Sequence, residues 1–314
     1  MRTSELAPVA LFAFNRPLHL RQTVEALQKN EFARDTGLFV FCDGARDAAE
    51  AQRTGQVREY ARSVTGFKAV EVIERASNLG LAQSIITGVN RVCGEFGRLI
   101  VMEDDLQTSP HFLRYMNDAL RLYADDPQVG SVHGYWYPVD RRMPETFFLR
   151  GASCWGWATW SRAWRLFEPD GRKLLKALEQ GRLTRLFDLD GSMAYTRMLK
   201  DQIAGRNNSW AIRWHAATFL AGSLQLSPGT SLVRNVGFDG TGTHCAPSEA
   251  YGVELSSRPI RVERIDLAES PEARAALIHY HRSSRRSLPA RVLSRMRRIG
   301  RNLATSSARP GEDS

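Results

Sequence analysis

The chain has 314 residues, of which 43% are hydrophobic and 25% charged, and these proportions are ordinary for a globular protein with a large core. The formal net charge is +9, but much of the excess is arginine after residue 282, which argues against a nucleic-acid-binding surface over the whole body. We therefore expect one large α/β domain, or one such domain with a smaller appended part.

The cysteines and the apolar runs indicate the compartment. The four cysteines are far apart and form no CxxC pair, which is typical of free thiols in a reducing compartment: Cys42, Cys93, Cys154 and Cys245. The N-terminal apolar run is too short for a signal peptide, and no stretch approaches the ~20 apolar residues of a spanning helix. We expect a cytoplasmic protein, with peripheral attachment to the inner face of the cell membrane as a further hypothesis.

The first 110 residues alternate between strand and helix patterns. Helices are expected after Pro17, around residues 57–60, after Gly80 and from Ser109-Pro110, because proline and serine suit the first turn and the cap of a helix. Unbroken apolar runs predict buried strands at residues 8–14, 38–42 and 99–102, and another strand is expected at 70–73. This alternation predicts a mostly parallel sheet with right-handed crossovers. No GxGxxG or GxxxxGK[ST] segment supports a dinucleotide fold or an NTPase loop.

The segment RLIVMEDDL, residues 98–106, joins a buried strand to three carboxylates, Glu103, Asp104 and Asp105. Ligands of open α/β sheets bind at the carboxyl ends of the strands. A hard divalent cation takes carboxylate oxygens and keeps places for phosphate oxygens and water. A solvated acidic turn is the simpler interpretation, but the position after a core strand favours a metal–diphosphate site.

The second half of the chain is rich in tryptophan and glycine. Trp155 and Trp157 lie in GASCWGWATW, residues 151–160, and Trp210 follows later. Because tryptophan faces stack on flat apolar surfaces such as sugar rings, the cluster predicts a pocket wall, with a buried core as the alternative. A glycine-rich loop, residues 237–245, carries Asp239 and His244. Further strands are expected at residues 129–132, 224–226 and 232–234, and helices at 192–204 and 210–220.

These motifs together resemble nucleotide-sugar glycosyltransferases with one nucleotide-binding α/β domain, the GT-A class. The chain is most similar to family-2-like bacterial sugar transferases, and more distantly to animal N-acetylglucosaminyltransferase I, whose acidic motif is also EDDL. The resemblance covers roughly residues 7–246 and rests on PVALFAFNRP, VFCDG, SNLGLAQS, IVMEDDL, CWGWATW, SWAIRW and VGFDGTGTH. It implies metal-dependent, inverting transfer of a hexosyl or N-acetylhexosaminyl group to a glycan or lipid-linked acceptor, in bacterial surface-polysaccharide assembly.

The resemblance also implies roles for the residues that match the nucleotide site. Asn15 and Arg16 would border the nucleoside. Asp43 would accept a hydrogen bond from the imide N–H of uracil or from another base edge, which favours a UDP-sugar as donor. Asn78 and Gly80 would lie beside the base and the ribose. Asp43 could equally cap a turn, and Asn78-Leu79-Gly80 could simply open a helix.

For the metal, the resemblance implies that Asp105 binds Mn²⁺ or Mg²⁺ directly. Glu103 and Asp104 would reach the ribose or the metal-bound waters, and His244 would help to hold the diphosphate or the metal. An ordinary loop histidine is the alternative for His244.

An inverting transferase needs a general base, normally an Asp or Glu, that takes the proton of the acceptor hydroxyl. Related sequences carry an acid just before the W-x-x-x-W segment, where this chain has Asn208, and asparagine cannot act as a carboxylate base. Asp201 is the nearest acid upstream, and Asp188 and Asp190 are further candidates. Two alternatives therefore stay open: a non-catalytic module that binds sugar nucleotides or glycans, and a nucleotidyltransferase that makes sugar nucleotides.

We expect a catalytic domain at residues 1–246, with a nucleotide-binding half at 1–110 and an acceptor-side half at 111–246. A C-terminal extension at 247–281 and a basic tail at 282–314 follow. After Pro289, the tail's apolar residues fall on one side of a helix with arginines flanking them. Such a helix can lie on an anionic membrane surface, and a disordered basic tail is the alternative. A nucleic-acid partner is not expected.

Overall fold

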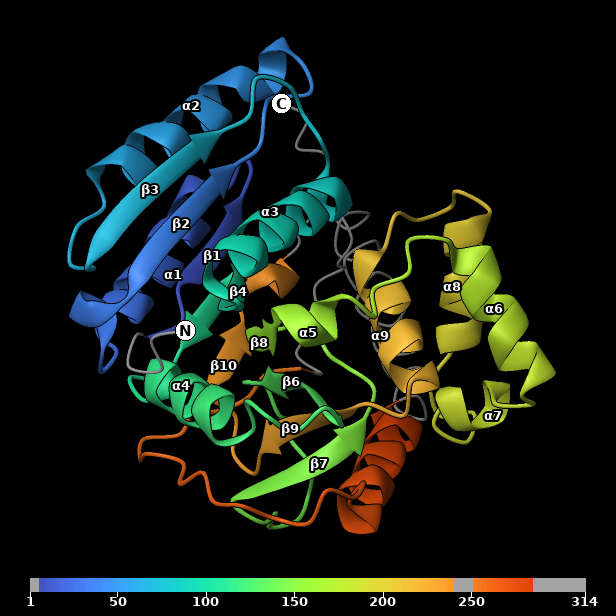
Figure 1. Ribbon diagram of the computed structural model, residues 1–314. Helices are drawn as coiled ribbons and strands as arrows, with labels where there is room; N and C mark the ends of the chain where they lie inside the picture. Colours follow the sequence, from blue (N-terminus) through green and yellow to red (C-terminus); the bar gives the residue numbers. More distant parts are fainter. Residues whose placement is uncertain (1–5, 240–250, 285–314) are drawn as a thin grey trace, which may run out of the picture.

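The computed structural model describes residues 6–239 and 251–284. The described strands form a large sheet with the order β3-β2-β1-β4-β8-β6-β9-β7 and a small sheet of β10 and β5 (Figure 1). In the large sheet, the pairs β3–β2, β2–β1, β1–β4 and β6–β9 are parallel, and the other pairs are antiparallel. The predicted mostly parallel α/β sheet is therefore confirmed.

The first half of the chain alternates between strand and helix, as predicted. Its elements are β1 (Val9–Ala13), α1 (Pro17–Gln28), a short 3-10 turn η1 (Ala33–Asp35), β2 (Gly37–Cys42), α2 (Ala48–Ser63), β3 (Ala69–Glu74), α3 (Leu81–Phe96) and β4 (Arg98–Glu103). Pro17 occupies the first turn of α1, where the N–H that proline lacks would have no helical partner. Because these four strands run parallel, their carboxyl ends meet at one edge of the sheet.

The second half completes the sheet and adds helices around it. Its elements are β5 (Leu106–Thr108), α4 (Phe112–Leu122), β6 (Val129–His133), β7 (Thr146–Arg150), β8 (Trp157–Trp160), α5 (Ser161–Trp164), α6 (Gly171–Gln180), α7 (Thr184–Phe187), α8 (Tyr195–Ile203), α9 (Trp210–Leu220), β9 (Leu224–Pro228), β10 (Val233–Asn235) and η2 (Gly237–Asp239). A last helix covers residues 271–284. The strands β7 and β8, the helix α6 and this last helix go beyond the predicted elements.

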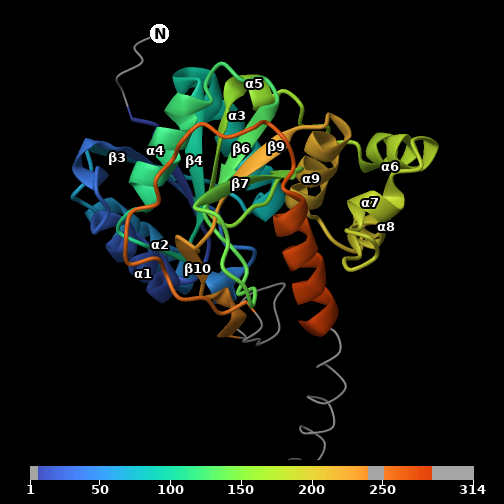
Figure 2. The ribbon, with the colours of Figure 1, turned by 90° about the horizontal axis from the view of Figure 1, so that it is seen from below.

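The period-two alternation of the strands divides the core into two layers. In β1, Val9 and Leu11 face the cluster that contains the apolar sides of α1, α2 and α4. Ala10 and Phe12 face the opposite cluster, which contains the apolar sides of α3 and α9. Figure 2 shows α3 above and α1 below the sheet. The sheet is thus covered on both faces, which explains why its central strands are almost entirely apolar.

The described residues 251–284 pack on the part of the chain that forms the sheets. Ser109 Oγ donates to the carbonyl of Ser256 at 2.7 Å, and Tyr123 OH donates to the carbonyl of Glu263 at 3.0 Å. The helix at residues 271–284 contributes Ala273 and Leu277 to an apolar cluster with β7, and its ribbon lies beside β7 and α9 in Figure 1. None of the described helices has the length and apolar character needed to cross a membrane.

Candidate active site

The acidic segment lies at the carboxyl end of β4, as its sequence predicts. The residues from Leu99 to Met102 are buried, and β4 pairs with β1 so that Glu103 lies opposite Phe12. Asp104 and Asp105 form the turn that follows, and β5 begins at Leu106. Burial of the strand therefore fixes where the carboxylates are placed.

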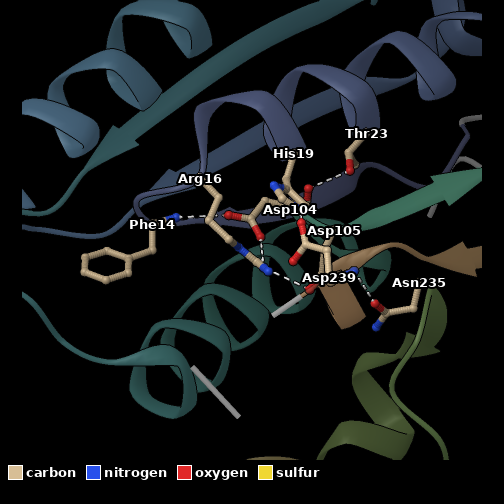
Figure 3. Close-up of polar contacts among 9 residues, drawn as sticks. Phe14, Arg16, His19, Thr23, Asp104, Asp105, Asn235 and Asp239 are labelled. Atoms are coloured by element: carbon tan, nitrogen blue, oxygen red, sulfur yellow. Dashed lines mark hydrogen bonds and ion pairs between the residues drawn. The ribbon is translucent and has the colours of Figure 1, made fainter. Parts of the chain in front are cut away.

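Arg16, at the end of the β1–α1 connection, pairs with both aspartates of this turn (Figure 3). Its Nη2 donates to Asp104 Oδ1 and, at 2.9 Å, to Asp105 Oδ2. Asp104 also accepts from the backbone N–H of Phe14 at 3.4 Å, and Thr23 Oγ1 donates to its carbonyl at 2.7 Å. We call Arg16, Asp104 and Asp105 the acid–arginine cluster. It joins the ends of β1 and β4.

The charges of this cluster are poorly solvated. Burial, and after it the charges of Asp105 and Asp104, raise the pKa of Glu103. Burial also raises the pKa of Asp104, and the Arg16 guanidinium opposes this shift. For Arg16 itself, burial would lower the pKa, but the two aspartates outweigh burial and the pKa is raised. The carboxyl groups of Glu103 and Asp104 are therefore harder to ionise than free ones, and the charge of Arg16 opposes this effect at both.

A late segment of the chain closes on the same cluster. Strand β10 pairs antiparallel with β5, and the N–H of Val236 donates to the carbonyl of Asp105 at 2.9 Å. Gly237 approaches so closely that a Cβ there would lie 2.2 Å from Asp105 Oδ2. Asp239 Oδ2 lies 3.1 Å from Nε2 of His19, in the first turn of α1 (Figure 3). His244 lies outside the described residues, five positions after Asp239.

A second group of predicted residues meets where β2 and β3 end. Asp43 Oδ1 accepts from the N–H groups of Gly44 at 2.9 Å and Leu79 at 2.8 Å, and Oδ2 accepts from the N–H of Gly80 at 2.9 Å. Asn78 Nδ2 donates to the carbonyl of Gly44 at 2.8 Å. The carboxylate of Asp43 thus holds the start of α3 against the end of β2.

Gly44→Ala is expected to lower the free energy of unfolding by about 1–3 kcal/mol, because the added methyl group overpacks this junction. A Cβ at Gly44 would lie 2.4 Å from the backbone carbon of Ser77 and 2.7 Å from the nitrogen of Asn78. Chemical denaturation measures the change. Gly55→Ala is the matched control, because a Cβ there meets nothing within 4 Å and alanine in a helix adds about 0.5–1 kcal/mol of stability. Equal stability of the two variants would contradict the close approach.

Asn15 lies slightly apart from both groups. Its Nδ2 donates to Glu50 Oε1 at 3.1 Å, and Glu50 is in turn paired with Arg46. The side chain of Asn15 is therefore directed toward the start of α2. Asn15 and Arg16 thus point to different neighbours, although they are adjacent in the sequence.

The predicted tryptophans separate into two environments. Trp157 is fully buried, and its ring stacks on Trp210 at 5.5 Å between centroids, in the core between the sheet and α9. This placement corrects the expectation that these two residues form a pocket wall: their rings pack against other aromatic side chains. Trp155 is partly exposed and contacts Phe238 and Tyr251 edge to face.

The sequence of the chain matches one protein family over much of its length. The family model described as "Glycosyl transferase family 2" matches residues 9–182, which is more than half of the chain. The chain belongs to glycosyltransferase family 2. Membership of this family agrees with the resemblance to nucleotide-sugar glycosyltransferases that the sequence motifs carry.

Three solved structures are similar to parts of this glycosyltransferase. One is the mannosyltransferase PcManGT from Pyrobaculum calidifontis in complex with GDP-Man and Mn²⁺, with 17% identity and a TM-score of 0.30 over 41% of this chain and 36% of that chain. S. aureus TarS matches with 16% identity and a TM-score of 0.30 over 46% and 24% of the two chains. Its fragment 1–349 matches with 14% identity and a TM-score of 0.33 over 55% and 49%. The chain thus spans less than half the length of each. A search of curated proteins found no match.

The candidate base Asp201 lies on α8 of the glycosyltransferase, in a lobe formed by α6, α7 and α8. Both views place this lobe on the opposite side of the molecule from α1 and α2 (Figures 1 and 2). Asp201 is ion-paired with Arg206, and its Oδ2 lies 4.0 Å from Arg197 Nε. Asn208 is exposed just before α9, whose cap is Ser209. The structure does not bring these residues to the acid–arginine cluster.

The other acids of that lobe have partners of their own. Asp188 Oδ1 accepts from the N–H of Thr196 at 2.7 Å, and Asp190 Oδ2 pairs with Arg274 at 2.8 Å. Asp190 therefore connects the lobe to the C-terminal helix.

Several residues of the site region were not predicted from the sequence. Arg58 Nη2 donates to the carbonyl of Arg75 at 2.6 Å and to that of Asp43 at 3.4 Å, which places a cation beside the β2–β3 junction. His19 and Phe238 join the site through long-range contacts. A histidine two positions after Pro17, in the first turn of the expected helix, was the available signal for His19, but its partner lies 220 residues away.

Proposed function

We propose that the protein transfers a sugar from a nucleoside-diphosphate sugar to a glycan or lipid-linked acceptor, with Mn²⁺ or Mg²⁺ bound at Asp105. The observation that carries this proposal is the convergence of Arg16, Asp104, Asp105 and Gly237 at the carboxyl ends of β1 and β4. Ligands of open α/β sheets bind at this edge.

The donor atoms at Asp105 suit a cation that arrives with its substrate. The described residues contain no group of three or more histidine, cysteine, aspartate or glutamate side chains arranged to hold a metal. Mg²⁺ is often bound by one or two carboxylates, with phosphate oxygens and water in its other places. Asp105 would supply the carboxylate, and glycine at position 237 lets the backbone approach this carboxylate where a side chain would collide with it. When bound, the metal neutralises the departing diphosphate.

We assign recognition of the base to Asp43, with UDP as the favoured nucleotide. Each carboxylate oxygen can accept two hydrogen bonds, and Oδ2 of Asp43 accepts one from Gly80 among the described residues. A second place on Oδ2 can receive the imide N–H of a uracil. The three backbone contacts of Asp43 hold its carboxylate in position for this contact, while Asn78 and Gly80 form the adjacent loop.

For the acceptor we propose the surface formed by Trp155, Phe238 and Tyr251. Their rings contact one another at centroid distances of 5.0–5.5 Å, and all three side chains are partly exposed. Phe238 directly follows Gly237, so this aromatic surface begins beside Asp105. Aromatic faces of this kind pack against sugar rings.

The experiment that tests the proposal incubates the protein with Mn²⁺ and a panel of nucleotide sugars and measures the nucleoside diphosphate released. We expect release that depends on the metal and is fastest with a UDP-sugar. Metal-independent release, or preference for another nucleotide, would refute the assigned cofactor or base. Addition of oligosaccharide or lipid-linked acceptors then identifies the acceptor class and the stereochemistry of the product.

We further propose that the basic tail attaches the enzyme to the inner face of the membrane during surface-polysaccharide assembly. Residues 285–314 lie outside the described residues, so the support is the sequence pattern alone. The full chain should co-sediment with anionic vesicles, and a chain ending at Ser284, where the described helix ends, should not. Equal binding of both chains would exclude the tail as the attachment.

A further inference from the structure

The guanidinium of Arg16 lies at the position where a cation would balance the two aspartates. Its side chain is 19% exposed, and those of Asp104 and Asp105 are 5% and 14% exposed. Arginine keeps its charge at all accessible pH values and presents a planar fork of donors to carboxylates. Arg16 therefore offsets one of the two negative charges of the aspartates without any metal.

We propose that Arg16 is a built-in counter-cation that competes with the divalent metal for Asp105 and gives way when a nucleoside diphosphate binds. This inference rests on the proposed function and deepens it. Arg16 acts as a positioning residue that makes metal binding depend on the nucleotide.

Competition follows from the geometry of Asp105. Arg16 Nη2 lies 2.9 Å from Asp105 Oδ2, and a Cβ at Gly237 would lie 3.1 Å from Arg16 Nη1. A Mg²⁺ ion sits about 2 Å from its ligand oxygens, so an ion on Oδ2 would come close to the guanidinium. Two cations at this separation repel each other strongly where water is scarce. The metal and Arg16 therefore cannot both bind Oδ2 in the observed arrangement.

A diphosphate removes this conflict by offering Arg16 a better partner. Arginine binds phosphate oxygens in a bidentate manner, and such charge-assisted hydrogen bonds are among the strongest in proteins. Arg16 directly precedes Pro17, at the N-terminus of α1, so its backbone stays fixed while the flexible side chain turns. The guanidinium can then neutralise the diphosphate, and the carboxylate of Asp105 becomes available to the metal.

The test measures binding of Mn²⁺ by electron paramagnetic resonance, without nucleotide, to the wild-type protein and to Arg16→Gln. We expect Arg16→Gln to bind Mn²⁺ with a dissociation constant at least about tenfold lower, which is the usual size of coupling between two binding events. Adding Asp105→Asn to Arg16→Gln should abolish this gain, because the ion would lose its ligand.

Arg274→Gln is the matched control. Arg274 has a similar exposure of 17% and also pairs with two carboxylates, Asp190 at 2.8 Å and Glu269 at 3.9 Å, but lies outside the cluster. Its substitution should leave Mn²⁺ binding at the wild-type level. A second readout is the melting temperature, which Mn²⁺ alone should raise in Arg16→Gln more than in the wild type.

The inference is overturned if wild type and Arg16→Gln bind Mn²⁺ alone with the same affinity. If Arg16→Gln does not fold, the Mn²⁺ affinity of the wild-type protein is measured with and without UDP. An affinity that UDP leaves unchanged would also overturn the inference. A different result would reject the proposed function and keep the inference. In that case Arg16→Gln binds Mn²⁺ more tightly than the wild type, but the enzyme releases no nucleoside diphosphate from any sugar nucleotide.

Discussion

Asp105→Asn is expected to lower the rate of sugar transfer at least about a hundredfold while changing the melting temperature little. Asparagine keeps the shape of the side chain but removes the charge that binds the metal, and the departing diphosphate then loses its neutralising ion. Stability is preserved because two effects oppose each other. The variant loses the pairing with Arg16 but relieves the repulsion of Glu103 and Asp104, whose pKa values are raised in part by Asp105.

The measurement is the initial rate of nucleoside diphosphate release at saturating Mn²⁺, together with thermal unfolding. Asp118→Asn is the control: Asp118 is a partly exposed acid on α4, paired with the exposed Arg121, and surface ion pairs of this kind contribute about 0–1 kcal/mol. It should retain full activity. An Asp105→Asn enzyme as active as the wild type would place the metal elsewhere.

The first 110 residues are the part of the fold that the sequence predicts best. The strands β1 and β2 and the centre of β4 are short apolar runs, and Pro17 marks the start of α1, so local chemistry and burial agree there. The acidic turn follows from the same reasoning, because a strand covered on both faces must deliver its next residues to the edge of the sheet.

The strands β7 and β8 were not predicted from the sequence, and the reason is physical. Their sequences, TFFLR and WATW, are apolar and aromatic without the alternation of a half-exposed strand, and short apolar runs of this kind fit helix and strand equally. The packing of Trp157 against Trp210 depends on α9 meeting the sheet. Whether a tryptophan lines a pocket or fills a core is decided by such tertiary contacts.

The contacts of the candidate site are likewise long-range. Arg16 and Asp105 are 89 positions apart, and Asp43 is 36 positions from Leu79. A single sequence shows which residue types stand at the ends of strands, and it therefore predicts the members of the site. Their pairing arises from the parallel register of β1 with β2 and β4, which brings distant loops together.

Gly237→Ala is expected to reduce transfer about a hundredfold, although residue 237 contributes no side chain to the reaction. The added methyl group would lie 2.2 Å from Asp105 Oδ2 and 2.9 Å from its Cγ, so either the carboxylate or η2 must move. A displacement of about 1 Å in an active site can cost a factor of 100 in rate. The substitution also crowds Arg16, and we expect a loss of about 1–3 kcal/mol in the free energy of unfolding.

The matched control for Gly237→Ala is Gly94→Ala in α3, where a Cβ meets nothing within 4 Å. This variant should be fully active and slightly more stable, because alanine favours the helix. Rates and Mn²⁺ affinity in the presence of UDP are compared for both variants. Wild-type kinetics in Gly237→Ala would mean that η2 moves to accommodate the methyl group without displacing Asp105. A large loss of rate with normal UDP binding would show that η2 positions the carboxylate that binds the metal.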